Sequence, residues 1–183
     1  MGDEQAPEFL IQPVVYPEPS PDAVVVLRPW NEGDRDFIES TWRRNYERVG
    51  RWTSCPGGLQ EYIATQAQVI ATCLATSDVL VACPAERPEQ ILGWCCFRRP
   101  STVHYVYVKP YYRRNGIATQ MLTEALQWTP KFLGPVYVSH DWRTGLGLDG
   151  INGMAKATEG IGLNIEYNPA LIFGAQRQEW MPR

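Results

Sequence analysis

The residues from Val103 to Leu126 constrain the fold more than any other part of the sequence. The first part alternates around valine and tyrosine, which is typical of a half-buried strand. Pro110 ends this strand, because proline has no N–H to donate to a sheet. From Ile117 the apolar residues recur at a helical period, so a helix with one apolar face begins there. The stretch therefore predicts a strand, a short basic turn and an amphipathic helix.

The turn itself contains Arg113, Arg114 and Gly116. The first N–H groups of a helix have no partner within the helix and carry the positive end of its dipole. Glycine lets another group approach the backbone closely, and the two arginines add positive charge. This arrangement favours a phosphate group. An ordinary strand-to-helix turn with solvated arginines is the alternative.

The six residues from Arg113 to Ala118, which read RRNGIA, resemble the R/Q-x-x-G-x-G/A segment of the GNAT family of acyl-CoA N-acyltransferases. The preceding strand, which ends at Val108, and the following helix match the family as well. The resemblance implies an α/β (α+β) fold with a mixed, mostly antiparallel central sheet of six to seven strands and about four flanking helices. It also implies a splayed central strand pair, and acetyl-CoA or coenzyme A as the cofactor.

In this family the turn holds the pyrophosphate of the cofactor through backbone N–H groups, and the splayed strand pairs with the pantetheine arm. The resemblance therefore implies cofactor-binding roles for one set of residues. They are Val106, Val108, Arg113, Arg114, Asn115, Gly116, Ile117, Ala118, Thr119 and Asn152.

A second segment, Asn152 to Leu163, resembles the penultimate helix of the family, with the pattern N-x-x-A-x-x-Y-x-x-x-G-F. Thr158 stands where the family has the tyrosine that protonates the leaving thiolate. A threonine hydroxyl is a far weaker acid than a phenol, whose pKa is about 10. Another group or water would then protonate the thiolate, or catalysis would be poor.

An amine acceptor must lose a proton before it attacks, and the sequence has two histidines that could accept it. His104 lies four residues before Val108, where several family members carry a catalytic base. Strict alternation places His104 on the same face as Val106 and Val108, and His140 ends the neighbouring strand. A core histidine is the alternative in each case. The N–H of Val108 is the predicted oxyanion donor.

Two loops, Gly50–Gly58 and Asp141–Gly150, are predicted to shape the acceptor site. Trp52, His140 and Asp141 are the substrate candidates. The resemblance implies that the first loop, with Trp52, walls the acceptor site, and the carboxylate of Asp141 could attract an ammonium group. An exposed loop aromatic and a solvated carboxylate are the alternatives. The second loop contains a literal G-x-G-x-x-G, but too little chain follows for a dinucleotide-binding half.

The remaining elements follow from local patterns. Asn31 and Asp34 have the spacing of a capping box before a helix. The predicted helices contain Phe37, Ile38, Trp42 and Tyr46 in the first and Leu59 to Ala75 in the second, where Tyr62, Ile63, Ala67, Ile70 and Leu74 face inward. The predicted strands are Val24–Arg28, Val79–Cys83, Ile91–Arg98, Val136–Ser139, Asn164–Tyr167 and Leu171–Phe173, and a short helix is expected near Asn152–Gly160.

Length and composition limit the domain organisation and the partners. A chain of 183 residues predicts one domain, residues 23–183, after a proline-rich arm at residues 1–22 that packs on the domain, packs on a second subunit or frays. A net charge of −3 argues against a general nucleic-acid-binding protein. No apolar run reaches the roughly 20 residues that are needed to span a membrane. The five cysteines lack a C-x-x-C pair, so we expect no metal site and a reducing cytoplasm. Cys95 and Cys96 should point to opposite faces of a strand.

Two hypotheses of function follow. The first is an acetyl-CoA-dependent N-acetyltransferase that acts on a primary amine of a small molecule or protein. The second is a GNAT-fold module that binds another protein. The HYVYVK run, residues 104–109, also resembles GNAT-like proteins of tailed bacteriophages, which would imply a host-directed target in the host cytoplasm.

Overall fold

One mixed sheet organises the computed structural model, which describes residues 24–49, 55–126, 136–139 and 165–172. Its strands lie side by side in chain order: β1 (Val25–Pro29), β2 (Asp78–Pro84), β3 (Gly93–Arg98), β4 (Thr102–Val108), β5 (Val136–Val138) and β6 (Ile165–Tyr167). The pairs from β1 to β4 are antiparallel, whereas β4–β5 and β5–β6 are parallel. The predicted mixed, mostly antiparallel sheet is confirmed.

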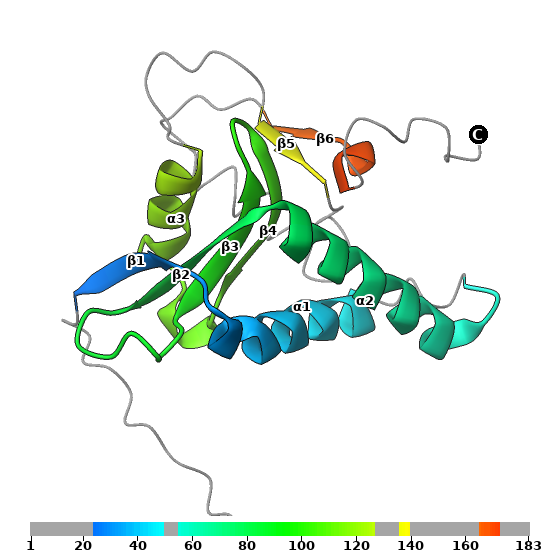
Figure 1. Ribbon diagram of the computed structural model, residues 1–183, viewed down its shortest axis with the longest axis horizontal. Helices are drawn as coiled ribbons and strands as arrows, with labels where there is room; N and C mark the ends of the chain where they lie inside the picture. Colours follow the sequence, from blue (N-terminus) through cyan, green and yellow to red (C-terminus); the bar gives the residue numbers. More distant parts are fainter. Residues whose placement is uncertain (1–23, 50–54, 127–135, 140–164, 173–183) are drawn as a thin grey trace, which may run out of the picture.

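Helices cover both faces of this sheet (Figure 1). α3 (Ile117–Ala125) lies on one face, and α1 (Arg35–Val49) and α2 (Gly58–Thr76) lie on the other. Short 3-10 helices, η1 (Glu32–Asp34), η3 (Pro110–Tyr112) and η4 (Pro169–Ile172), complete the described elements. Each face has its own apolar core. Met121 and Phe97 belong to the α3 side, and Trp42 and Trp94 to the α1–α2 side.

The neighbouring cysteines of β3 confirm this two-faced arrangement. Cys95 packs in the core under α3, whereas Cys96 packs in the core under α1 and α2. Both side chains are fully buried free thiols. Burial raises the pKa of each thiol, so neither is a ready nucleophile at neutral pH.

The entry to α1 is fixed by a buried carboxylate. Asp34 accepts a hydrogen bond from the N–H of Asn31 at 2.8 Å, and the side chain of Asn31 accepts one from Gly33, which completes the predicted capping box. Arg28 of β1 donates to both oxygens of Asp34, at 2.7 and 2.8 Å. The guanidinium holds the pKa of Asp34 below its usual value. One carboxylate thus joins the first strand to the first helix.

A β-bulge interrupts the pairing of β3 with β4. Cys96 lies opposite Tyr105, but Phe97 lies opposite Val103, so His104 is an extra residue in β4. The register of β4 with β5 covers Thr102 and Val103, and the N–H of Ser139 still donates to the carbonyl of Val103 at 3.2 Å. In the described residues the β5 register ends at Val103, and the chain after Ser139, where the implied splay would begin, lies outside them.

Three details differ from the sequence predictions. Ala67 is exposed because the first half of α2 reaches beyond the sheet (Figure 1). Leu171 and Ile172 belong to η4 and not to a strand, because the chain turns after Asn168, whose carbonyl accepts the N–H of Leu171 at 3.4 Å. The predicted helix near Asn152 lies outside the described residues. Within the described part of the chain, no helix is long and apolar enough to cross a bilayer.

The buried hydrogen bond between Trp94 and Thr41 gives a stability prediction. The indole Nε1 donates to Thr41 Oγ1 at 3.0 Å, and Thr41 donates in turn to the carbonyl of Phe37 at 2.8 Å. Thr41→Val leaves the indole N–H without this acceptor, so we expect the free energy of unfolding to fall by about 1–3 kcal/mol in chemical denaturation.

Thr65→Val is the matched control. Thr65 is an exposed residue of α2 whose hydroxyl donates to the carbonyl of Glu61, as a helical threonine often does. Its replacement should change the free energy of unfolding by less than about 0.5 kcal/mol. Equal losses in the two variants would show that the Trp94 bond contributes nothing specific.

Candidate functional site

The basic turn between β4 and α3 has an unusual backbone. Gly116 precedes the first residue of α3 with φ 77° and ψ −2°, in the left-handed region that favours glycine. Arg114 also has a positive φ, 71°, which is uncommon for a residue with a side chain. Such a backbone costs energy and is found most often at binding and catalytic sites.

The N-terminus of α3 is open. Among the described residues no side chain caps it, and a Cβ added to Gly116 would meet none of their atoms within 4 Å. Ile117, the first residue of the helix, is buried in the core together with Met121, so the helix cannot shift away. The arrangement presents the positive end of a fixed helix to open space.

Arg113 ties the turn to the end of β4. Its Nε donates to the carbonyl of Val108 at 3.1 Å. Arg113, Arg114, Asn115 and Gly116 are all exposed. The structure thus brings together the predicted basic residues on one short exposed loop at the end of the central strand.

The bulge at His104 decides where the main-chain groups of β4 point. The N–H of Lys109 donates to Leu92 at 2.9 Å, so Lys109 faces β3. Successive residues of a strand point their peptide groups to opposite edges of the strand. Val106 and Val108 therefore face away from β3, toward the β5 side. The carbonyl of Val103, before the bulge, already faces β5. Without the extra residue, Val106 and Val108 would point toward β3.

The same bulge overturns one prediction about His104. Val106 and Val108 pack on the α3 side of the sheet, and Tyr105 packs on the α1–α2 side. His104 contacts Ser139, with 2.8 Å between Nδ1 and Oγ, and Ser139 alternates with Val138 of the α3-side core. His104 therefore lies on the α1–α2 side, and the prediction that it shares a face with Val106 and Val108 is wrong.

The environment of His104 is that of a core residue. The side chain is fully buried, and its Nε2 has no hydrogen-bond partner in the described residues. Burial, together with the nearby charge of Arg98, lowers the pKa of the imidazole to about 4. His104 is therefore neutral at physiological pH and a weak base, which favours the alternative of a core histidine.

Several other predicted residues cannot be placed. Trp52, His140, Asp141, Asn152 and Thr158 lie outside the described residues. Of the cofactor candidates, Ala118 and Thr119 are half-buried in the first turn of α3. In the described residues no group of three or more His, Cys, Asp or Glu side chains could hold a metal ion.

Sequence patterns missed two features. The bulge has no signature in the run TVHYVYV, because any residue can occupy a bulge. No sequence pattern indicates a contact for Lys109, yet its Nζ lies 5.0 Å from the ring centroid of Phe37 on α1. The contact joins positions 72 residues apart in the sequence, and local periodicity carries no signal for it.

Comparison with known proteins gives an independent view. A sequence model described as the acetyltransferase (GNAT) family matches residues 35–140, more than half of the chain. Among curated proteins the sequence has no match.

Several solved structures are similar to this chain at low identity. YjaB from Escherichia coli is 14% identical, with a TM-score of 0.51, and the match covers 73% of this chain and 81% of that one. A possible acetyltransferase from Clostridium difficile 630 is 15% identical, with a TM-score of 0.49 and coverages of 79% and 93%. AAC(6')-Iy, solved in complex with a bisubstrate analog of coenzyme A, is 14% identical, with a TM-score of 0.45 and coverages of 78% and 92%. At these identities the likeness to YjaB shows the fold alone.

The buried imidazole of His104 predicts a pH dependence of stability. Its folded pKa of about 4 lies below the ordinary value of 6.5, so between these values the unfolded chain binds a proton that the folded chain does not. The free energy of unfolding should therefore fall as pH drops from 6.5 to 4, by on the order of 2 kcal/mol from this residue.

His104→Gln tests this expectation, since glutamine can still bond to Ser139 but does not titrate. Chemical denaturation of both proteins at pH 7 and pH 4.5 isolates the difference. Equal losses in the two proteins would show that His104 does not titrate in this range.

Proposed function

The chain belongs to the GNAT family of acetyltransferases, and we propose that it transfers the acetyl group of acetyl-CoA to a primary amine. The observation that carries the proposal is the turn from Arg113 to Ala118. It combines an uncapped helix N-terminus, a glycine with open space around it and two exposed arginines. Each of these features suits the binding of a phosphate group.

The residues of the turn fit the cofactor. The N–H groups from Asn115 to Ala118 would hold the pyrophosphate, and Arg113 and Arg114 would add charge at the rim. The lack of a Cβ at Gly116 leaves the approach clear. When bound, acetyl-CoA supplies a thioester, whose acetyl group is already activated for transfer to an amine.

The edge of β4 that faces away from β3 supports a second part of the proposal. The peptide groups of Val106 and Val108 point to this edge. We propose that the N–H and the carbonyl of Val106 bind an extended arm of the cofactor as a strand would, whereas the carbonyl of Val108 already accepts a bond from Arg113. The N–H of Val108 would stabilise negative charge on the acetyl oxygen during transfer. The Arg113 bond to the carbonyl of Val108 holds this peptide in place.

Proton transfer does not require His104. A buried imidazole with a pKa of about 4 is a poor acceptor for an ammonium proton. We propose that the acceptor loses its proton to solvent before it attacks. His104 would instead stabilise the bulge of β4 through its contact with Ser139. Positioning of the two reactants can supply about 7–11 kcal/mol of the barrier reduction, so a strong internal base is not essential. Thr158, in place of the family tyrosine, would leave thiolate protonation to water.

Cofactor binding is tested at Gly116. Gly116→Asp places a negative charge at the phosphate position, and we expect affinity for coenzyme A in calorimetry to fall at least tenfold, about 1.4 kcal/mol. Gly116→Asn is the matched control, because asparagine has the same size, carries no charge and tolerates the left-handed backbone. Its added bulk should weaken binding as well, so the effect of the charge is the ratio of the two variants' affinities, which we expect to be at least about tenfold.

Two results would contradict this prediction. Equal weakening by aspartate and asparagine would mean that the phosphates do not lie at Gly116. An unchanged protein that does not bind millimolar coenzyme A would end the proposal of a cofactor.

The pH dependence of turnover tests the proton step. If solvent takes the proton, kcat/KM for a primary amine should rise about tenfold per pH unit below the pKa of that amine. The reason is that the fraction of neutral amine, which is the attacking form, rises by the same factor. Release of thiol from acetyl-CoA over pH 6–9 measures it, with His104→Gln as the comparison. A bend near pH 6–7 that disappears in His104→Gln would assign the base to His104. If coenzyme A binds but no amine or peptide releases thiol, the chain is a cofactor-binding module and not an acetyltransferase.

A further inference from the structure

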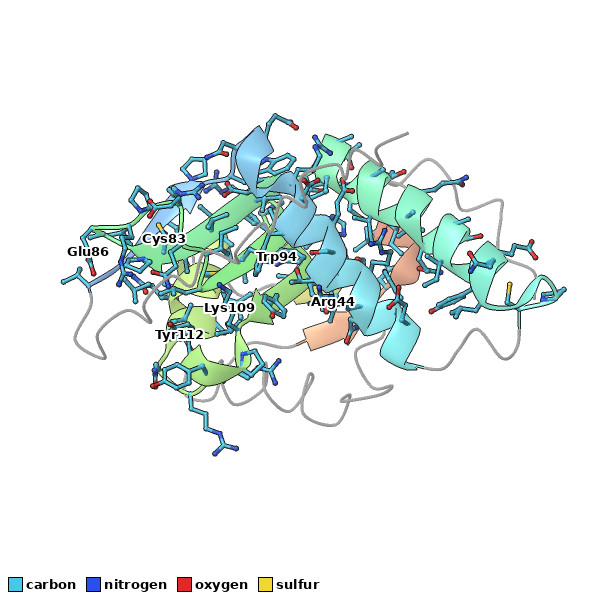
Figure 2. The ribbon with its side chains drawn as sticks, turned by 90° about the horizontal axis from the view of Figure 1, so that it is seen from below. Arg44, Cys83, Glu86, Trp94, Lys109 and Tyr112 are labelled. Carbon is cyan, nitrogen blue, oxygen red and sulfur yellow. The ribbon has the colours of Figure 1, made fainter. Side chains whose placement is uncertain are left out.

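A hollow of about 680 Å³ lies on the α1 side of the segment that leads into the cofactor turn. Three parts of the chain form it: the start of α1, the turn between β2 and β3, and η3. Its walls include Phe37, Gln90, Ile91, Lys109, Tyr111 and Tyr112. In Figure 2, Lys109 and Tyr112 lie on the opposite side of α1 from α2. The hollow includes none of the residues from Arg113 to Ala118, so it is not the proposed cofactor site.

Lys109 places a cation in this wall without a counter-ion. Its ammonium lies 5.0 Å from the centroid of Phe37, and among the described residues it forms no ion pair. Burial is the cause that lowers its pKa, and no carboxylate offsets this effect. An ammonium that is partly removed from water and unpaired gains energy from an anion that enters beside it.

The other charged groups of the hollow limit the charge of the ligand. Asp34 is already neutralised by the two bonds from Arg28. Glu89 is exposed at the rim and forms no ion pair with another described residue. One ammonium beside one unpaired carboxylate suits a monoanion better than a doubly charged phosphate.

The remaining wall is aromatic. Tyr111 is 69% exposed, and its ring meets the ring of Tyr112 edge to face at 5.2 Å. Phe37 stands on the α1 side, with Ile91 beside it. A large exposed tyrosine next to a second ring and a phenylalanine suits a flat ring, which gains from stacked or edge-on contacts.

We propose that this hollow is a second ligand site for a small aromatic carboxylate. The carboxylate pairs with Lys109, and the ring lies against Phe37 and Tyr111. Because Lys109 to Tyr112 continue directly into Arg113, the bound ligand also fixes the position of the cofactor turn. The inference stands on this hollow alone and does not depend on acetyl transfer.

The test uses 4-hydroxybenzoate as the probe and calorimetry on the full chain. We expect saturable binding at micromolar to millimolar concentration. The neutral analogue 4-hydroxybenzamide should bind at least tenfold more weakly. No binding at 10 mM, or equal binding of the amide and the carboxylate, would overturn the proposal.

Variants locate the site. Lys109→Met keeps the length of the side chain and removes the charge, so affinity should fall at least tenfold, whereas Lys109→Arg should stay within about threefold. Arg43→Met, which removes a cation from the exposed face of α1, is the matched control and should have no effect. Thermal melting confirms that each variant is folded. Unchanged affinity in Lys109→Met would overturn the assignment.

Coenzyme A separates the two sites. Gly116→Asp should leave the affinity for 4-hydroxybenzoate within about threefold, since Gly116 does not line the hollow. Probe and coenzyme A should bind together in one titration. Displacement of the probe by coenzyme A would place it at the cofactor turn and refute the second site, whether or not the protein is an acetyltransferase.

Discussion

The extra residue in β4 at His104 is the constraint on which the site depends. Before it, the carbonyl of Val103 still accepts a bond from Ser139 beside β5. After it, the alternation of the strand is reversed, and the peptide groups of Val106 and Val108 point away from β3. A regular strand would have directed those groups toward β3. The bulge therefore places these groups on the β5 side, and His104 lies at the bulge as a buried, neutral side chain.

The two apolar cores fix the end of β4 and the start of α3 relative to each other. On one side, Ile117 and Met121 anchor α3 to the sheet, so the N-terminus of the helix stays at the end of β4. On the other side the core is aromatic. Trp42, Trp94 and Tyr105 stack with centroids 5.0–5.3 Å apart, which fixes α1 over β3 and β4. Gly93 permits this close packing of strands, because a Cβ there would lie 2.7 Å from the carbonyl of Tyr107.

The positive side chains at the end of β4 also lie on two different surfaces of the protein. Positive groups of the turn, Arg113 and Arg114, stand in water beside the open helix end, where they can meet a highly charged ligand. Lys109 instead points to the α1 side, over the ring of Phe37 and partly out of water. The 3-10 turn η3, which lies between Lys109 and Arg113, thus separates neighbouring cations onto two different surfaces. This is why one stretch of sequence carries both the proposed cofactor turn and the second hollow.

The sequence by itself determined the elements and the chemical character of the turn. Alternation and helical period predicted the strand, the basic turn and the helix from Val103 to Leu126, and the spacing of Asn31 and Asp34 predicted the capping box. These predictions hold because the patterns reflect interactions between residues that are close in the chain. Tertiary structure alone decided the direction of each group. The bulge reversed the face expected for His104, Ser139 met it from 35 residues away, and Phe37 met Lys109 from the first helix. Pairing between distant strands sets a register, and a shift of one residue reverses every face beyond it.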